Sequence, residues 1–135
     1  MLDRDQEELE KATSEVVNSN ALHFDISVSG TGDKVADLIS SKCAGLDALV
    51  NNAGVAQFGP IETCDSQTWR EVMDTNLDGM FYLSQSLTPI LRKSRGSIVN
   101  IASISGLRAS TLRIAYGTSK AAVMQLSKQQ AIELG

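Results

Sequence analysis

Two side chains four residues apart, Tyr116 and Lys120, form the pair in this sequence best suited to proton transfer. On a helix, residues four apart share a face, so the ammonium would lie about 5 Å from the phenol. A phenol alone is a poor acid–base catalyst, because its unperturbed pKa is about 10. At an effective dielectric of ~20, the ammonium would favour the phenolate by roughly 3 kcal/mol. The pair could then exchange a proton with an alcohol or a carbonyl, although Y-x-x-x-K also occurs by chance.

Three further features could carry chemistry, although each also has an ordinary structural interpretation. Asn76 falls on the apolar stripe of a predicted helix, where its amide must either bond a neighbouring backbone or serve a function. The segment Val50-Asn-Asn-Ala-Gly54 ends an apolar strand, at the edge where open α/β sheets bind ligands, but it could be a simple turn. Ser103 follows the next apolar strand, thirteen residues before Tyr116, and could equally be a solvated loop serine.

The elements that would position these residues alternate along the chain. They are a helix near 5–17, a strand near 21–26, a helix near 32–43, a strand at 46–51, a long helix near 66–93, a strand at 97–102 and a helix from 114 to the end. Strands that alternate with helices of ten or more residues predict βαβ units on a parallel sheet. The last two strands are almost continuously apolar, which predicts that both of their faces are covered.

Composition and charge exclude several classes of protein. The chain has 135 residues, of which 42% are hydrophobic, and its net charge of −4 argues against binding to nucleic acid. No apolar run approaches the ~18–20 residues of a membrane span, and the acidic first ten residues do not resemble a secretion signal, so we expect a cytoplasmic protein with no membrane partner. Cys43, Cys64 and the single His23 are not clustered, so we expect no metal site.

Four motifs together resemble one family. Asn51-Asn-Ala-Gly54, Asn76 in Thr75-Asn-Leu-Asp-Gly79, Ser103 in Asn100-Ile-Ala-Ser-Ile-Ser-Gly106, and Tyr116-Gly-Thr-Ser-Lys120 are similar to the short-chain dehydrogenase/reductase family in type, order and spacing. The resemblance implies a partial Rossmann-like, doubly wound parallel α/β sheet, with 1–135 as the central fragment of one NAD(P)-binding domain. It also implies an oxidoreductase that transfers hydride between NAD or NADP and a secondary alcohol or ketone.

The resemblance assigns a role to each member of a catalytic tetrad. Tyr116 would be the general acid/base on the substrate oxygen, and Lys120 would favour its ionised form and hold the nicotinamide ribose. Ser103 would hydrogen-bond the substrate oxygen. Ser105 competes for that role, but the family's spacing favours Ser103. Asn76 would hold a water that connects Lys120 to solvent.

The resemblance also implies a set of cofactor contacts. They are Asp25 and Ile26 at the adenine, Asn52, Ala53 and Gly54 at the ribose and the sheet, and Tyr116 with Lys120 at the nicotinamide end. Asp3 matches the position that often selects between the two cofactors, because a carboxylate there can bond the ribose 2′-hydroxyl and repel a 2′-phosphate. Arg4 could instead attract that phosphate. We favour NAD over NADP.

The family's glycine-rich loop after the first strand does not occur in this sequence. Leu2-Asp-Arg-Asp5 resembles the loop after the second strand, and Gly135 precedes the sixth, so we expect the first two strands and the C-terminal strands to be missing. In the order 3-2-1-4-5-6, the strand at 21–26 would then have no neighbour. We therefore expect this chain by itself to be inactive.

A second hypothesis belongs to another class of function. The chain would be a catalytically inactive fragment that serves at most as an association module. In the family, the helices matching 66–93 and 114–135 commonly form the subunit interface of a homodimer or homotetramer. The sequence leaves open both the substrate and the choice between these hypotheses.

Overall fold

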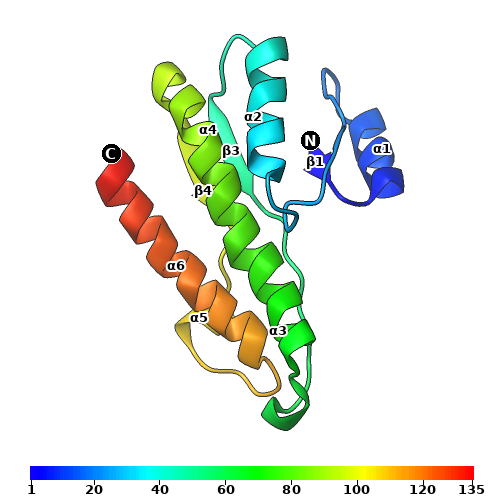
Figure 1. Ribbon diagram of the computed structural model, residues 1–135, viewed down its shortest axis with the longest axis vertical. Helices are drawn as coiled ribbons and strands as arrows, with labels where there is room; N and C mark the ends of the chain where they lie inside the picture. Colours follow the sequence, from blue (N-terminus) through cyan, green and yellow to red (C-terminus); the bar gives the residue numbers. More distant parts are fainter.

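The computed structural model describes residues 1–135, and its helices and strands alternate as the sequence predicts (Figure 1). The elements are β1 Leu2–Asp3, α1 Gln6–Glu15, β2 Leu22–His23, α2 Thr31–Lys42, β3 Ala48–Asn51, η1 Ile61–Thr63, α3 Ser66–Met73, η2 Asp74–Gly79, α4 Met80–Ser94, β4 Ser97–Asn100, α5 Ile104–Leu107 and α6 Ile114–Leu134. None of these helices is both long enough and apolar enough to cross a lipid bilayer.

Four strands form two parallel pairs. β1 pairs with β2, with Leu2 opposite Leu22, and β3 pairs with β4, with Ala48 opposite Ser97. Both pairs are parallel, as the alternation of strands and helices predicts. The pairs are joined through α2, which crosses from the end of β2 to the start of β3.

The expectation that strand 21–26 has no neighbour was wrong. Leu2 and Asp3 form β1 beside it, and Phe24 N donates a backbone hydrogen bond to Asp3 O at 3.0 Å. The ladder is short because the chain leaves β1 at once to enter α1. The side chain of Asp5 caps that helix by accepting a hydrogen bond from Glu8 N. The strand at 22–23 therefore has a parallel neighbour over two residues.

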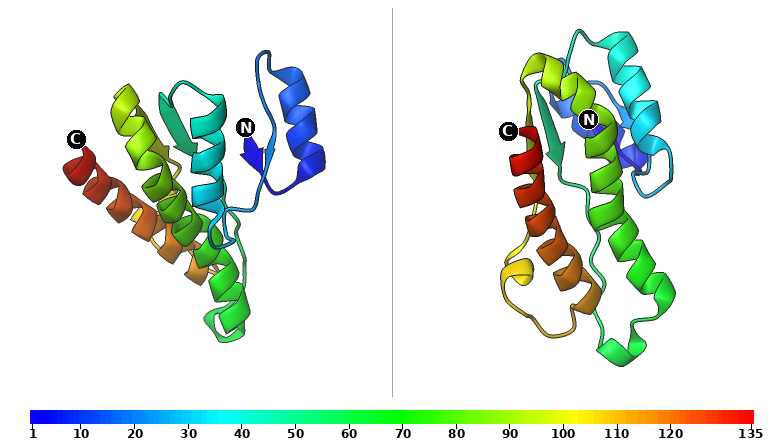
Figure 2. Two further views of the ribbon diagram at one scale, coloured as in Figure 1. Left: turned by 45° about the horizontal axis from the view of Figure 1, so that its top comes forward. Right: turned by 60° about the vertical axis from the view of Figure 1, so that its left-hand side comes forward.

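The hydrophobic core lies between α2, α4 and one face of the strands. Val35 of α2 packs with Leu83, Leu87 and Leu91 of α4, and Phe24, Ile26, Leu49 and Ile98 pack against this cluster. Figure 2 shows α2, α4 and α6 on the same side of the β3–β4 pair, with α1 standing apart beside β1. These helices form one covering layer of a doubly wound α/β fold.

The other face of the β3–β4 pair is open, which corrects the prediction that both faces are covered. Val50 is 59% exposed and Val99 is 47% exposed, while their sequence neighbours Leu49 and Ile98 pack on the core. Successive side chains of a strand point to opposite faces, so a single helical layer buries only every second residue.

The predicted helix 66–93 divides into α3, a π-helical turn η2 and α4. Wider π turns occur mostly as single insertions in α-helices, frequently at functional sites. The turn ends at Gly79, where an added Cβ would lie 2.5 Å from Ile26 O. Only glycine allows the helix to approach the end of β2 this closely. The turn also carries Asn76, which is fully buried.

Candidate functional site

The first two turns of α6 present Tyr116 and Lys120 on one face. The Lys120 Nζ lies 5.9 Å from the centroid of the Tyr116 ring. Lys120 is 4% exposed, and its Nζ donates a hydrogen bond to Ile101 O at 2.6 Å. Ile101 directly follows β4 and donates its own N–H to Asn51 O. The ammonium is therefore held against the carboxyl ends of both β3 and β4.

Burial lowers the pKa of Lys120 from its ordinary value, and the charge of Tyr116 partly opposes this by raising it. An ammonium removed from water loses solvation, so the neutral form becomes relatively more favourable. The cation is kept in this position by the Ile101 carbonyl and by the neighbouring phenol.

This shift gives a prediction about stability and pH. The pKa of Lys120 is lower in the folded than in the unfolded state, so the unfolded state binds more protons between the two values. The free-energy cost of burying the charged ammonium is fully present below the pKa of Lys120 in the folded state. This cost disappears as the pH rises to the pKa in the unfolded state, near 10.5. We expect wild type to gain stability relative to Lys120→Met between pH 7 and pH 10.5, measured by urea unfolding. A constant difference between the two proteins would contradict this.

Helix α5 lies between the predicted strand at 97–102 and the predicted helix from 114, where no helix was expected, and it fixes Ser103 relative to α6. Ser103 caps α5, because its Oγ accepts a hydrogen bond from Ser105 N at 3.2 Å. A Cβ added to Gly106 would lie 2.6 Å from Lys120 C and 2.7 Å from Lys120 O. The backbone of α5 therefore touches the backbone of α6 at Lys120. Ser105 is buried in this contact, whereas Ser103 is half-buried at its edge.

The buried amide of Asn76 connects the site's two halves. Its Oδ1 accepts from Val55 N at 2.8 Å, and its Nδ2 donates to Val55 O at 2.9 Å and to Ser119 Oγ at 3.0 Å. Ser119 in turn donates to Tyr116 O. Both amide protons are thus used within the protein, so a water could reach this side chain only by donating to Oδ1. The role of Ser119 could not be predicted from the sequence, because no pattern distinguishes it from the other small residues within Y-x-x-x-K.

Gly54 lies in front of Asn76 and Lys120. An added Cβ there would be 3.3 Å from Asn76 Oδ1 and 3.5 Å from Lys120 Nζ. The two polar atoms therefore border the same space beside Gly54. Both could contact a group placed in that space.

The two asparagines after β3 have different environments. Asn51 is 5% exposed, and its Nδ2 donates to Ser84 Oγ and to Asn100 Oδ1, both at 2.9 Å. Asn100 extends this network by donating to Ser127 and Gln130 of α6. Asn51 thus binds β3 to β4, α4 and, through Asn100, α6. Asn52 is exposed beyond the strand end.

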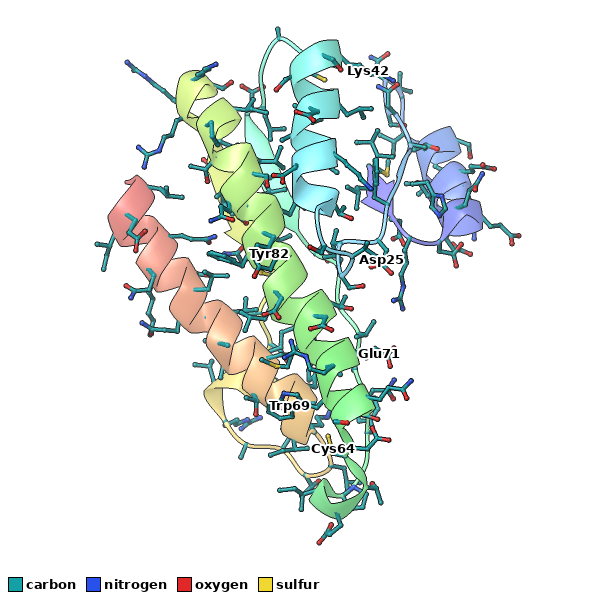
Figure 3. All side chains as sticks on the ribbon, in the orientation of Figure 1. Asp25, Lys42, Cys64, Trp69, Glu71 and Tyr82 are labelled. Carbon is teal, nitrogen blue, oxygen red and sulfur yellow. The ribbon has the colours of Figure 1, made fainter.

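Most of the residues expected to contact the cofactor line one cavity of about 170 Å³. The expected residues in its wall are Asp3, Asp25, Ile26, Ala53 and Gly54, and the others are Leu2, Arg4, Phe24, Val55 and Thr75. Asn52, Tyr116 and Lys120, the other three expected contacts, are not part of this wall. Figure 3 shows Asp25 where the chain passes from β2 toward the base of α2. The carboxyl ends of β1, β2 and β3 meet here, which is where sheets of this class bind ligands.

Hydrogen bonds and charge fix the carboxylates of this cavity. Asp25 accepts from Ser27 N at 2.9 Å and from Ser27 Oγ at 2.7 Å, and Arg4 lies 3.8 Å from it. Partial burial alone would raise the pKa of Asp25, but the hydrogen bonds from Ser27 and the charge of Arg4 lower it overall. Asp3 accepts from Asp5 N at 3.0 Å. The guanidinium of Arg4 is therefore engaged with Asp25.

Thr75, which no sequence pattern singles out, is the one buried side chain with an unsatisfied polar atom. The residue is 5% exposed, and its Oγ1 has no hydrogen-bond partner. An unpaired buried hydroxyl costs roughly 1–3 kcal/mol. Thr75 lines the same cavity as Asp25 and Gly54, so a polar ligand there could satisfy it. The cavity therefore fits a group with hydroxyl or amine functions.

The strand ends, the cavity and the helix-borne Tyr116 and Lys120 define a partial Rossmann-like α/β protein. The family model described as short chain dehydrogenase matches residues 1–135. The chain belongs to the short-chain dehydrogenase family.

Individual relatives agree with this assignment. The chain is 36% identical to the inactive 2-(S)-hydroxypropyl-CoM dehydrogenase 2 of Xanthobacter autotrophicus, over 98% of this chain and 59% of that protein. NAD+-bound xylitol dehydrogenase is 29% identical with a TM-score of 0.92, covering 98% of this chain and 54% of that chain. A gluconate 5-dehydrogenase of Burkholderia cenocepacia J2315, in complex with NADP and tartrate, is 25% identical with a TM-score of 0.88, at the same coverage. The chain spans about half the length of the curated relatives it matches.

Proposed function

We propose that the complete protein containing this chain is an NAD(P)-dependent oxidoreductase that interconverts a secondary alcohol and a ketone. The observation that carries this proposal is the position of Lys120 Nζ, which is buried beside the Tyr116 ring and next to Gly54 and Asn76. Short-chain dehydrogenases act with nicotinamide cofactors, and one of the similar structures holds NAD+ while another holds NADP.

The cofactor, when bound, supplies or accepts the hydride, and the chain's own residues handle the proton and the geometry. Tyr116 gives a proton to the ketone oxygen in reduction and removes it from the alcohol in oxidation. Lys120 stabilises the ionised tyrosine through its charge. Ser103, half-buried at the tip of α5, hydrogen-bonds the substrate oxygen. Asn76 borders the space beside Lys120, where a water could connect the ammonium to solvent.

The residues around the cavity that contains Asp3 and Asp25 would hold the cofactor's adenosine. Asp25 and Ile26 would contact the adenine, and Ala53 and Gly54, which follow β3, line the same cavity. Asn52 would reach the ribose from outside the cavity wall. The unpaired hydroxyl of Thr75 supports this assignment, because an adenosine offers it a partner.

The experiment that tests this function uses the complete protein. NADH and NADPH absorbance is followed with a panel of ketones that includes sugars, polyol-derived ketones, 3-oxoacyl thioesters and steroids. We expect the protein to reduce at least one of these classes of ketone, and we expect this activity to require Tyr116. Absence of any turnover, with cofactor binding retained, would instead favour an inactive protein.

We also propose that Asp3 makes NAD the preferred cofactor. Its carboxylate lines the cavity and would repel a 2′-phosphate, while Arg4 is engaged with Asp25. We expect Asp3→Ser to lower the ratio of kcat/KM with NAD to that with NADP several-fold, because the repulsion is removed. Asp37→Ser, on the exposed side of α2, is the control. A wild-type protein that already prefers NADP tenfold would contradict the role of Asp3.

An association function is the second candidate, and it does not require activity. Phe81 and Tyr82 of α4 are 40% and 56% exposed, with their rings in edge-to-face contact at 5.3 Å. Ile132 near the end of α6 is 78% exposed. Exposed aromatic and aliphatic side chains are typical of protein interfaces. We propose α4 and α6 as the surface through which copies of the complete protein associate as dimers or tetramers.

A further inference from the structure

Arg113, which immediately precedes α6, places a second cation beside Tyr116. Its guanidinium carbon lies 5.9 Å from the Tyr116 ring centroid and 4.6 Å from that of Phe58. The residue is half-buried, and its guanidinium forms neither an ion pair nor a hydrogen bond. Lys120 approaches the same ring from within the helix. The Tyr116 ring therefore lies near two cations, Lys120 within α6 and Arg113 just before the helix begins.

The backbone around Arg113 is held in an uncommon conformation. Leu112 has φ = 59°, in the left-handed region, which costs a residue with a Cβ roughly 1–2 kcal/mol. Leu112 O accepts a hydrogen bond from Gly59 N at 3.0 Å, and Gly59 forms an isolated bridge with Arg113. Such strain persists only where surrounding contacts impose it, and it concentrates at functional sites. Here the contacts fix Arg113 between Phe58 and Tyr116.

Arg113 has no carboxylate partner, unlike Arg4 and Arg70. Arg4 pairs with Asp25, and Arg70 pairs with both Asp74 and Asp78. Acidic residues outnumber basic ones by 16 to 12 in this chain, yet none pairs with Arg113. The N-terminus of α6, whose cap makes no side-chain hydrogen bond, adds positive potential at the same place. The site is thus electropositive within an acidic protein.

We propose that Arg113 binds an anionic group of the substrate, a carboxylate or sulfonate, while the substrate's carbonyl faces Tyr116. This rests on the proposed function and specifies its substrate class: oxo acids and the corresponding hydroxy acids. A guanidinium presents two parallel N–H donors that match the two oxygens of such a group. The two aromatic rings reduce its contact with water, which strengthens the pairing.

The test compares an acid with its neutral ester in the complete protein. The substrates are 4-oxopentanoate and methyl 4-oxopentanoate, reduced with the preferred cofactor. We expect wild type to favour the acid, and Arg113→Gln to lower the acid-to-ester ratio of kcat/KM at least ~10-fold, since a hydrogen-bonded charge pair is lost. Arg113→Lys should recover part of the ratio. Arg108→Gln, an exposed change between α5 and α6, is the matched control and should leave the ratio unaltered.

Two kinetic results would overturn the proposal. One is a wild-type protein with no preference for the acid. The other is an Arg113→Gln protein that loses activity on acid and ester by the same factor, because that would show Arg113 acting only through Tyr116. A binding measurement separates this proposal from the proposed function. Calorimetry with pentanoate and methyl pentanoate should show binding of the acid that Arg113→Gln removes, whether or not any ketone is reduced; binding unaffected by the variant counts against Arg113.

Discussion

Replacing Tyr116 by phenylalanine in the complete protein is expected to lower turnover at least ~10²-fold while changing cofactor affinity by no more than a few-fold. The substitution removes only the hydroxyl that exchanges the proton. The ring that lies 5.9 Å from Lys120 Nζ remains, as does the backbone carbonyl that accepts from Ser119. Steady-state kinetics with the best ketone of the panel measure the loss, and fluorescence titration with NADH measures the affinity.

Stability provides the control for this experiment. The Tyr116 hydroxyl has no hydrogen-bond partner in the protein, so its removal leaves no buried group unsatisfied. We expect the free energy of unfolding of Tyr116→Phe to stay within about 0.5 kcal/mol of wild type. A stable variant with near-normal turnover would disprove the role of Tyr116. A strongly destabilised variant would show that the hydroxyl has a structural role instead.

Replacing Asn76 by alanine is expected to destabilise the protein by roughly 3–5 kcal/mol. The amide makes three hydrogen bonds at a position with no solvent exposure. Its loss would leave Val55 N and Val55 O without a partner, and Ser119 Oγ with only its hydrogen bond to Tyr116 O. Each orphaned backbone group costs roughly 1–3 kcal/mol before relaxation. Urea unfolding, monitored by the fluorescence of the single Trp69 in the region where α3 meets α6 (Figure 3), measures the change.

Ser119→Ala is the graded control for Asn76→Ala. It removes one of the three partners of the Asn76 amide and leaves both contacts with Val55 intact. We expect a loss of about 1 kcal/mol from this variant. Equal effects of the two substitutions would mean that the hydrogen bond to Ser119, and not the two hydrogen bonds to Val55, accounts for most of the stability that Asn76 contributes. An Asn76→Ala protein as stable as wild type would show that the buried amide contributes nothing.

The spacing of Tyr116 and Lys120 predicted their relative position better than the pattern of residues 21–26 predicted the length of that strand. Tyr116 and Lys120 share a face because a helix places residues four apart one turn apart, which requires no knowledge of the remaining fold. The strand at 21–26 was predicted from its alternating side chains, but only Leu22 and His23 pair in a ladder. The extent of a ladder depends on its partner, and β1 offers only Leu2 and Asp3.

Local sequence gave no indication of two other elements. Helix α5 depends on the contact of Gly106 with the backbone of Lys120, fourteen residues further along the chain. The π turn η2 ends where Gly79 meets Ile26 O, a contact between residues more than fifty positions apart. Neither contact leaves a periodic signal, since a single glycine is compatible with many local structures.

By itself, the sequence determined the alternation of strands and helices, the parallel sheet and the family, because periodicity and motif spacing are local properties. The tertiary structure alone decided which polar groups meet. It placed the Asn76 amide between Val55 and Ser119, left the Thr75 hydroxyl unpaired in the cavity with Asp25, and positioned Arg113 beside Tyr116 without a carboxylate. Such pairings depend on the packing of distant segments, and hydrogen bonds act only over about 3 Å. The chain order therefore does not reveal them.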